Sequence, residues 1–139
     1  MIHAYEIAQA LQVKKWERDA VVLAALWHDI GRTFDGGDYY HGAKSAGKVV
    51  GIGLHRGGPP EQLDVALYAV THHSGDEEHG VIAAQHCCDE AAALRVFKIL
   101  KDADGLDRVR FRKLDPSYLR LPGSVARVAR AQELLLLVP

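Results

Sequence analysis

The apolar residues of this 139-residue chain recur mostly at intervals of three and four, and no segment alternates apolar and polar residues between hairpin-type turns. Such spacing places apolar side chains along one face of a helix, which disfavours a sheet-based fold. The predicted helices span residues 3–13, 17–30, 41–54, 61–73, 81 or 89 to 104, and 124–137. We therefore predict an all-α fold, a helical bundle of about six helices in a single domain, residues 1–139.

Composition narrows the class of protein. Apolar residues make up 48% of the chain and charged residues 25%, and the formal net charge is -1, which is ordinary for a globular protein. Without an overall basic charge, we expect no nucleic-acid partner. No apolar run is long enough to cross a bilayer and no signal peptide is visible, so we expect no membrane association and a cytoplasmic protein. The only cysteines, Cys87 and Cys88, are neighbours, which predicts a reducing compartment without a disulfide framework.

An imidazole and a carboxylate follow the apolar residues 20–27, in the segment Trp27-His28-Asp29-Ile30-Gly31-Arg32. Gly31 is typical of a helix C-terminus. A charged carboxylate in a buried helix costs several kcal/mol unless it is paired or bound to a metal ion. Two explanations of Asp29 are therefore open: an ion pair with Arg32, or coordination of a divalent metal.

The chain has eight histidines, and an excess of histidine indicates metal binding. Several candidates have a simpler explanation when taken alone. His72 and His73 would close a helix, where the dipole favours imidazolium, and Asp104 would pair with Lys101 or Arg108. Taken together they predict a metal site between helices. The candidate metal ligands are His3, His28, Asp29, His41, His72, His73 and Asp104.

The consecutive residues His28 and Asp29 restrict where a metal ion can lie. Their side chains point about 100° apart on a helix, so both reach one ion only if it lies beside the helix end. His3 and Asp104, from distant helices, would then complete the site. Two nitrogens and two carboxylates suit zinc, manganese, iron or magnesium.

A second ion has its own candidate ligands. His41 and one or both of His72 and His73 would bind it, and Asp29 would bridge the two ions. Because successive side chains on a helix diverge, we expect one histidine of the adjacent pair to bind metal and the other to face the substrate or an acidic partner.

On these motifs the chain resembles the HD superfamily of metal-dependent phosphohydrolases. The resemblance implies that His3, His28, Asp29 and Asp104 hold a core metal, and that His41 with His72 or His73 holds a second. It implies one or two divalent ions (Fe, Mn, Zn, Mg or Co), with His28 and Asp29 as catalytic residues. The motifs are Ile2-His3-Ala4, Trp27-His28-Asp29-Ile30-Gly31-Arg32, His41-Gly42-Ala43, Thr71-His72-His73-Ser74-Gly75 and Lys101-Asp102-Ala103-Asp104-Gly105-Leu106-Asp107.

The function that the resemblance implies is hydrolysis of a phosphate ester or anhydride in a small, nucleotide-like substrate. A bound divalent ion would activate water for attack on phosphorus. Loops at residues 33–40, 54–60 and 74–80 are expected to shape the pocket. Each candidate phosphate-binding side chain could equally be a solvated charge. These candidates are Arg32, Lys44, Lys101 and Arg108.

Two alternatives stay open. One is an HD-type mixed-valent di-iron oxygenase with the same ligands. The other is a non-catalytic metal-binding module for sensing or assembly, a possible homodimer through the helix at 124–137. The apolar residues of that helix are expected to belong to the core rather than to an interface. They are Val125, Val128, Ala129 and Leu134 to Leu137.

Overall fold

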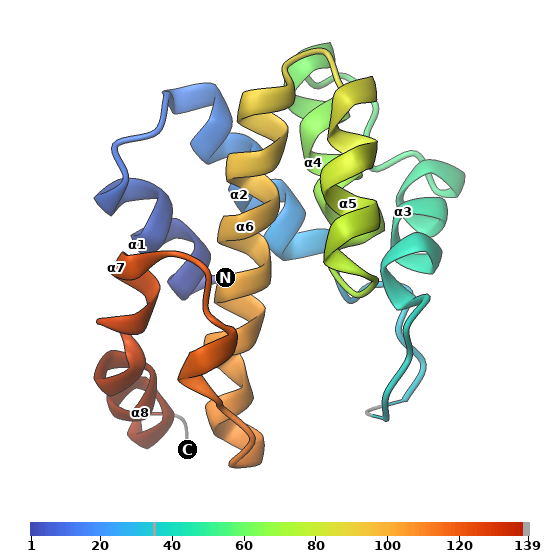
Figure 1. Cartoon of the computed structure of the whole chain (residues 1–139). Coiled ribbons are helices and arrows are strands. Elements are labelled where there is room, and N and C mark those ends of the chain that lie inside the picture. The colour runs from blue at the N-terminus through green and yellow to red at the C-terminus, as the bar shows by residue number, and fades with distance from the viewer. Residues whose placement is uncertain (35, 138–139) are drawn as a thin grey trace.

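The fold is all-helical, as predicted. We describe residues 1–34 and 36–137 of a computed structural model; this part of the chain forms eight α-helices and three short 3-10 helices and contains no strand (Figure 1). No described helix is both long and apolar enough to cross a membrane. The elements are α1 (Ile2–Ala10), α2 (Lys15–Trp27), α3 (His41–Gly51), α4 (Pro60–His72), α5 (Glu77–Ala83), η1 (Ala84–His86), α6 (Glu90–Asp107), η2 (Arg108–Phe111), η3 (Pro116–Tyr118), α7 (Pro122–Val125) and α8 (Val128–Leu136).

Helix α6 runs through the middle of the molecule, and α1, α2 and α4 pack against it (Figure 1). Its apolar residues recur at helical spacing, and Val96, Phe97 and Leu100 are buried almost completely. Each such side chain contributes about 1.5–3 kcal/mol through burial. Helix α3 packs on α4, and the start of α3 also touches the turn that follows α2. The start of α3, the end of α4 and the end of α2 therefore lie close together. This arrangement brings three separate parts of the sequence together.

The helix predicted at 17–30 ends earlier than expected. Helix α2 stops at Trp27, and His28 and Asp29 lie in the turns that lead to Gly31. The two polar residues are therefore half-buried at the helix end rather than inside a buried helix. Asp35, part of the predicted loop at 35–38, lies outside the described residues.

The predicted loop at 74–80 is wrong beyond residue 76, whereas the later of the two predicted starts of the next helix, residue 89, agrees with α6. Helix α5 begins at Glu77, because Asp76 caps it by accepting a hydrogen bond from Glu78 N at 3.1 Å. Helix α6 begins separately at Glu90, with Asp89 accepting from Ala92 N at 2.9 Å. Two local caps thus divide a stretch in which hydrophobic spacing alone shows no boundary.

The C-terminal helix predicted at 124–137 is broken into α7 and α8. Ala131 is its buried apolar residue, whereas Leu136 is 85% exposed and Leu137 is 73% exposed. The expectation of core positions is therefore wrong for Leu135 to Leu137, whereas Val128 packs against the core as expected. Only one turn of α8 reaches the body of the protein closely enough to bury a side chain.

Candidate metal centre

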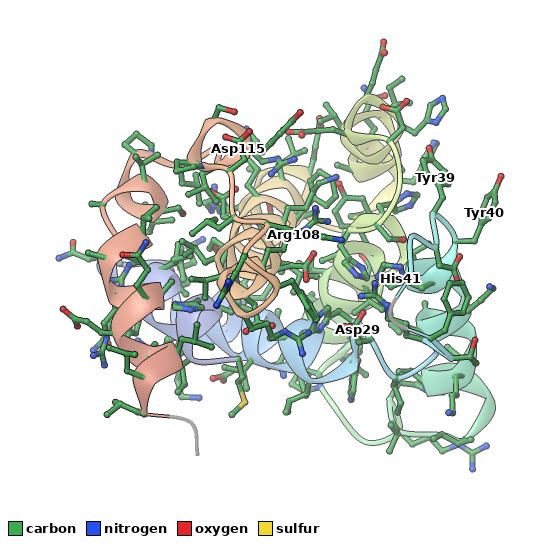
Figure 2. The ribbon with its side chains drawn as sticks, turned by 90° about the horizontal axis from the view of Figure 1, so that it is seen from below. Asp29, Tyr39, Tyr40, His41, Arg108 and Asp115 are labelled. Carbon is green, nitrogen blue, oxygen red and sulfur yellow. The ribbon has the colours of Figure 1, made fainter. Side chains whose placement is uncertain are left out.

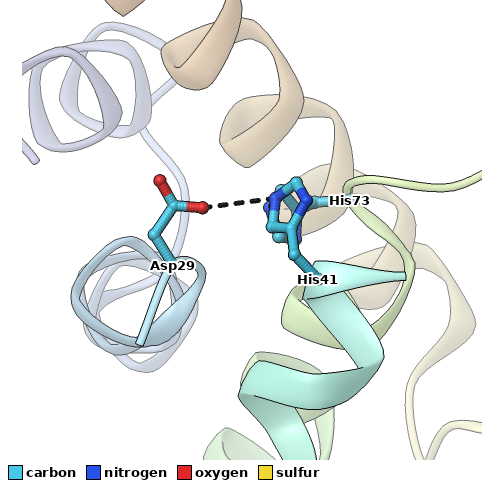
Figure 3. Close-up of side chains that lie close together, drawn as sticks. All are labelled: Asp29, His41 and His73. Carbon is cyan, nitrogen blue, oxygen red and sulfur yellow. Dashed lines mark hydrogen bonds and ion pairs between the residues drawn. The ribbon is translucent and has the colours of Figure 1, made fainter. Parts of the chain in front are cut away.

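Asp29, His41 and His73 meet at the junction of α2, α3 and α4 (Figure 3). One side-chain ligand atom from each lies within 4.8 Å of the other two. Asp29 Oδ1 is 3.2 Å from His41 Nε2, which is 2.9 Å from His73 Nε2. Both histidines are buried. This group contains one carboxylate and two imidazoles, a set of ligands suited to a divalent metal.

Backbone carbonyls fix the orientation of three imidazole rings. His41 Nδ1 lies 2.5 Å from Asp38 O, His73 Nδ1 lies 2.7 Å from Val70 O, and His28 Nδ1 lies 2.8 Å from Ala25 O. A carbonyl oxygen only accepts, so each Nδ1 must carry the proton and donate it. Each neutral ring therefore presents the lone pair of its Nε2 atom, which is the form in which histidine binds a metal.

With both rings in this neutral form, the centre of the cluster holds no proton. The Nε2 lone pairs of His41 and His73 face each other across 2.9 Å. Asp29 Oδ1 is buried and has no hydrogen-bond partner among the described residues. Burial lowers the pKa of His73 to about 3, so this imidazole stays neutral in neutral solution. Three electron-rich atoms in contact repel one another unless a cation lies among them, so these residues fit a divalent metal ion.

Two glycines allow the three segments to approach one another. A Cβ on Gly31 would lie 2.5 Å from Ser45 N, and a Cβ on Gly42 would lie 2.5 Å from Val70 O. Hydrogen bonds hold the same contacts: Gly31 N donates to Ser45 Oγ at 2.9 Å, and Gly42 N donates to Ser74 Oγ at 3.0 Å. The backbone at the end of α2 thus touches α3, and the start of α3 touches the end of α4. The cluster exists because no side chain separates these backbones.

The other face of Asp29 meets a second group of candidate ligands. Asp29 Oδ2 is 3.5 Å from His28 Nε2, and His28 Nε2 is 4.0 Å from Asp104 Oδ1. Arg32 also approaches Asp29 Oδ2, at 3.5 Å, so the simpler explanation of an ion pair is present as well. The two oxygens of Asp29 therefore face different partners, which is the geometry that a bridging carboxylate needs.

Of the adjacent pair on α4, His73 lies in the cluster and His72 does not. The ring of His72 packs against Tyr68, with centroids 5.2 Å apart, and its pKa is lowered by burial and then by the nearby His79. His3 is buried in α1, its Nδ1 has no hydrogen-bond partner, and burial lowers its pKa. In the described part of the chain, no hydrogen bond or ion pair joins His3 to the cluster.

Comparison with known families places the chain. A family model described as HD domain matches residues 1–109. The chain belongs to the HD-domain family. No curated protein and no solved structure matched it. The matched region of the HD domain contains every candidate ligand, and it ends where α6 gives way to η2.

A cavity of about 670 Å³ opens beside this group of candidate ligands, two of which, His41 and His73, line it. Asp104 lines it as well, and we call the side of the cavity formed by these three residues the metal end. Of the four predicted phosphate-binding residues, Arg32, Lys101 and Arg108 line the cavity. Lys44 does not; its ammonium group pairs with Asp38 at 2.8 Å on the surface.

Sequence reasoning missed one wall of this cavity. Residues 36–39 and 74 contribute as expected for the loops at 33–40 and 74–80, but the loop at 54–60 does not line it. The segment after α6 lines it instead, and Figure 2 labels two of its residues, Arg108 and Asp115. The available signal was the density of basic residues in Arg108-Val109-Arg110-Phe111-Arg112-Lys113. The lining cations absent from the prediction are Arg110, Lys113 and Arg120.

Proposed function

We propose that this HD domain is a metal-dependent phosphohydrolase that acts on a small, nucleotide-like phosphate ester or anhydride. The observation that carries the proposal is the cluster of Asp29, His41 and His73, whose ligand atoms face one another beside a cavity whose lining includes several lysines and arginines. The HD-domain family consists mostly of metal-dependent phosphohydrolases, which agrees with this arrangement. Metal bound here would lower the pKa of water and withdraw charge from a phosphoryl oxygen.

The residues of the chain would supply binding and orientation. Arg32 is held in place by hydrogen bonds to Phe34 O and Gly36 O, each 3.1 Å long, while its guanidinium group lines the cavity next to Asp29. A guanidinium fixed in this way can bind a phosphate oxygen without a large loss of side-chain entropy. Arg32 would therefore neutralise the phosphate that reacts.

Lys101 would contribute a second cation. It lies on α6 one turn before Asp104, and its Nζ donates to Gly75 O at 3.1 Å. The side chain is half-buried and burial lowers its pKa from the usual value, so its charge is poorly compensated by water. Binding a phosphate dianion would replace that lost solvation.

The test combines metal analysis with an activity assay. Protein prepared in turn with manganese, iron, zinc, magnesium and cobalt is analysed for bound metal and assayed against a panel of nucleotides and phosphate esters. We expect bound metal and phosphate release by the wild type, and loss of both in a His28→Ala, Asp29→Ala double variant. A matched control, His86→Ala with Asp19→Ala, changes the same residue types at sites away from the cluster and should behave as wild type.

The assay also distinguishes the alternative functions. Full phosphatase activity in the His28→Ala, Asp29→Ala variant contradicts the proposal. Bound iron with oxygen consumption and no phosphate release indicates the di-iron oxygenase instead. Protein that binds no stoichiometric metal under any of these conditions indicates a sensing or assembly module.

A further inference from the structure

The cavity has a second wall that lies beyond the family match. Residues 110–120 follow the matched region, yet seven of the residues that line the cavity come from this stretch. They are Arg110, Phe111, Lys113, Asp115, Tyr118, Leu119 and Arg120. With Arg108 they form a surface that we call the distal wall. It faces the same space as His41 and His73.

A defined turn begins the distal wall. Arg112 has a left-handed backbone with φ of 56°, and it ends the 3-10 helix η2. Arg112 N donates to Val109 O at 3.0 Å and Lys113 N donates to Arg108 O at 3.2 Å, the hydrogen-bond pattern of a Schellman motif. The chain therefore reverses direction at Arg112, which brings Lys113 back beside Arg108.

A buried carboxylate holds the other end of the wall. Asp102 is fully buried on α6 and accepts hydrogen bonds from Arg120 N at 2.9 Å and Leu121 N at 2.8 Å. The guanidinium of Arg120 contacts Asp102 at 3.3 Å and Glu77 at 2.6 Å, and so ties the wall to α5 as well. Asp102 precedes the candidate ligand Asp104 by two residues on one helix. The wall is thus built at a fixed position relative to the metal end.

Two cations of the wall have no ionic partner in the part of the chain that the structure describes. Arg120 is occupied by Asp102 and Glu77, and Arg110 pairs with Asp107 at 2.7 Å. Arg108 and Lys113 line the cavity and form no ion pair within residues 1–34 and 36–137. A pair of uncompensated cations in one cavity is suited to an anion that carries more than one charge.

We propose that Arg108 and Lys113 bind a second phosphate of the substrate, away from the phosphate that is hydrolysed. This inference rests on the proposed phosphohydrolase function and names its substrate class, a nucleotide with two phosphates. The cavity, at about 670 Å³, lies within the range of pockets that hold a whole small molecule. A compact monophosphate at the metal end would leave the distal wall without a ligand.

The first experiment compares substrates. We measure kcat/KM for a nucleoside 5′-monophosphate, the matching 5′-diphosphate and the matching 3′,5′-bisphosphate, with wild type and with an Arg108→Ala, Lys113→Ala double variant. At least one doubly phosphorylated substrate should be preferred by wild type, and the variant should lose roughly tenfold or more of that preference, as expected for charge-assisted hydrogen bonds. A preference for the 5′-diphosphate would show that the second phosphate is attached to the first. A preference for the 3′,5′-bisphosphate would show that it is attached to the other hydroxyl of the ribose.

The matched control is Arg112→Asn. It removes one positive charge from the same segment, tolerates a left-handed backbone and alters no residue that lines the cavity. It should keep the substrate preference of wild type. Equal kcat/KM for all three substrates, or an unchanged preference in the double variant, overturns the inference while leaving the phosphohydrolase function intact.

A second experiment does not depend on activity. Isothermal titration measures binding of the nucleoside 3′,5′-bisphosphate and of the 5′-diphosphate to metal-free protein. Wild type and Arg112→Asn should bind at least one, and the Arg108→Ala, Lys113→Ala variant should bind it roughly tenfold more weakly. Failure of wild type to bind either nucleotide, or equal binding by all three proteins, overturns the inference even if no hydrolysis is ever detected.

Discussion

The two ends of the cavity are built in different ways. At the metal end, backbones touch at Gly31 and Gly42, and the ligand atoms of His41 and His73 lie 2.9 Å apart. At the distal wall, Arg108 and Lys113 are exposed side chains on short turns that are attached to α6 chiefly through Asp102. At the metal end, a Cβ added to Gly31 or Gly42 would collide with backbone atoms, whereas the distal wall can change its side chains while the backbone hydrogen bonds remain.

In the function that we propose, the metal end carries out the chemistry and the distal wall selects the substrate. A metal centre needs ligand atoms placed to within a fraction of an ångström, which close backbone packing provides. A wall that chooses among substrates needs charges of suitable sign within reach, which a short loop provides at little cost to the core. The family match covers the first and stops before most of the second. The following predictions test each end against the other.

The largest effect is expected for Gly42→Ala. The new Cβ would meet Val70 O at 2.5 Å and His73 Nδ1 at 3.0 Å, disturbing the hydrogen bond that orients His73. We expect a loss of about 1–3 kcal/mol in unfolding free energy and roughly 10–100-fold in metal affinity. Denaturant unfolding and metal titration measure the two quantities.

The control for this change is Gly47→Ala, because Gly47 lies on the same helix and its Cβ would meet nothing within 4 Å. That variant should be neutral or up to about 1 kcal/mol more stable, since alanine favours a helix over glycine. Equal behaviour of the two variants would show that close packing at the metal end is unimportant.

Asp102→Asn should act on the distal wall. An amide oxygen in the place of Oδ2 could still accept from Arg120 N and Leu121 N, but the NH2 group in the place of Oδ1 cannot accept from Arg120 Nη1, and the negative charge beside that guanidinium is lost. We expect the unfolding free energy to fall by about 1–3 kcal/mol and the substrate preference set by the wall to weaken.

Asp19→Asn is the matched control for Asp102→Asn, because Asp19 makes an exposed ion pair with Lys15 and such pairs contribute about 0–1 kcal/mol. If Asp102→Asn keeps full stability and full substrate preference, Asp102 does not hold the wall.

The pH dependence of stability should reveal the histidines whose pKa is lowered by burial, of which His73 belongs to the metal end. The pKa of His73 is lowered from 6.5 to about 3, and the pKa values of His3 and His72 are lowered as well. Below pH 6.5 the unfolded chain therefore binds protons that the folded metal-free chain does not. The contribution of these histidines to the free energy of unfolding is fully present above that pH. It is lost as the pH decreases, by up to about 1.4 kcal/mol per pH unit for each proton.

Urea unfolding of metal-free protein between pH 7.5 and 5 measures this slope, in a range above the titration of most carboxylates. His73→Gln should reduce the slope. A stability that is constant or increases toward pH 5 would contradict the neutral state of His73.

The smallest effect is expected for Arg112→Gly. A left-handed backbone costs a residue other than glycine about 1 kcal/mol, and glycine is the usual residue at this position of a Schellman motif. We expect a gain of about 0.5–1 kcal/mol, seen as a higher Tm. Arg112→Ala, which removes the charge but keeps the strain, should give no gain. A gain of the same size in Arg112→Ala would point to charge rather than to backbone conformation.

Much of this protein can be predicted from local patterns in the sequence. Hydrophobic spacing predicted the all-α fold and most of its helices, because burial of one apolar face needs that spacing. The five motifs taken together, and not the one around His28 and Asp29 alone, predicted the family. The leucines at 135–137 were misinterpreted, since apolar composition alone does not tell whether a neighbour is present to cover them.

Contacts between distant residues decided the rest. His72 and His73 are equivalent neighbours in the sequence, and the packing of α4 on α3 selects His73 for the cluster. The neutral form of His73 depends on burial and on a carbonyl three residues away, and the distal wall depends on hydrogen bonds from Arg120 and Leu121 to Asp102. Residue type and spacing thus determine which elements form and which side chains can bind metal. Tertiary packing determines which of those side chains meet, because each such meeting joins residues that are far apart in the chain.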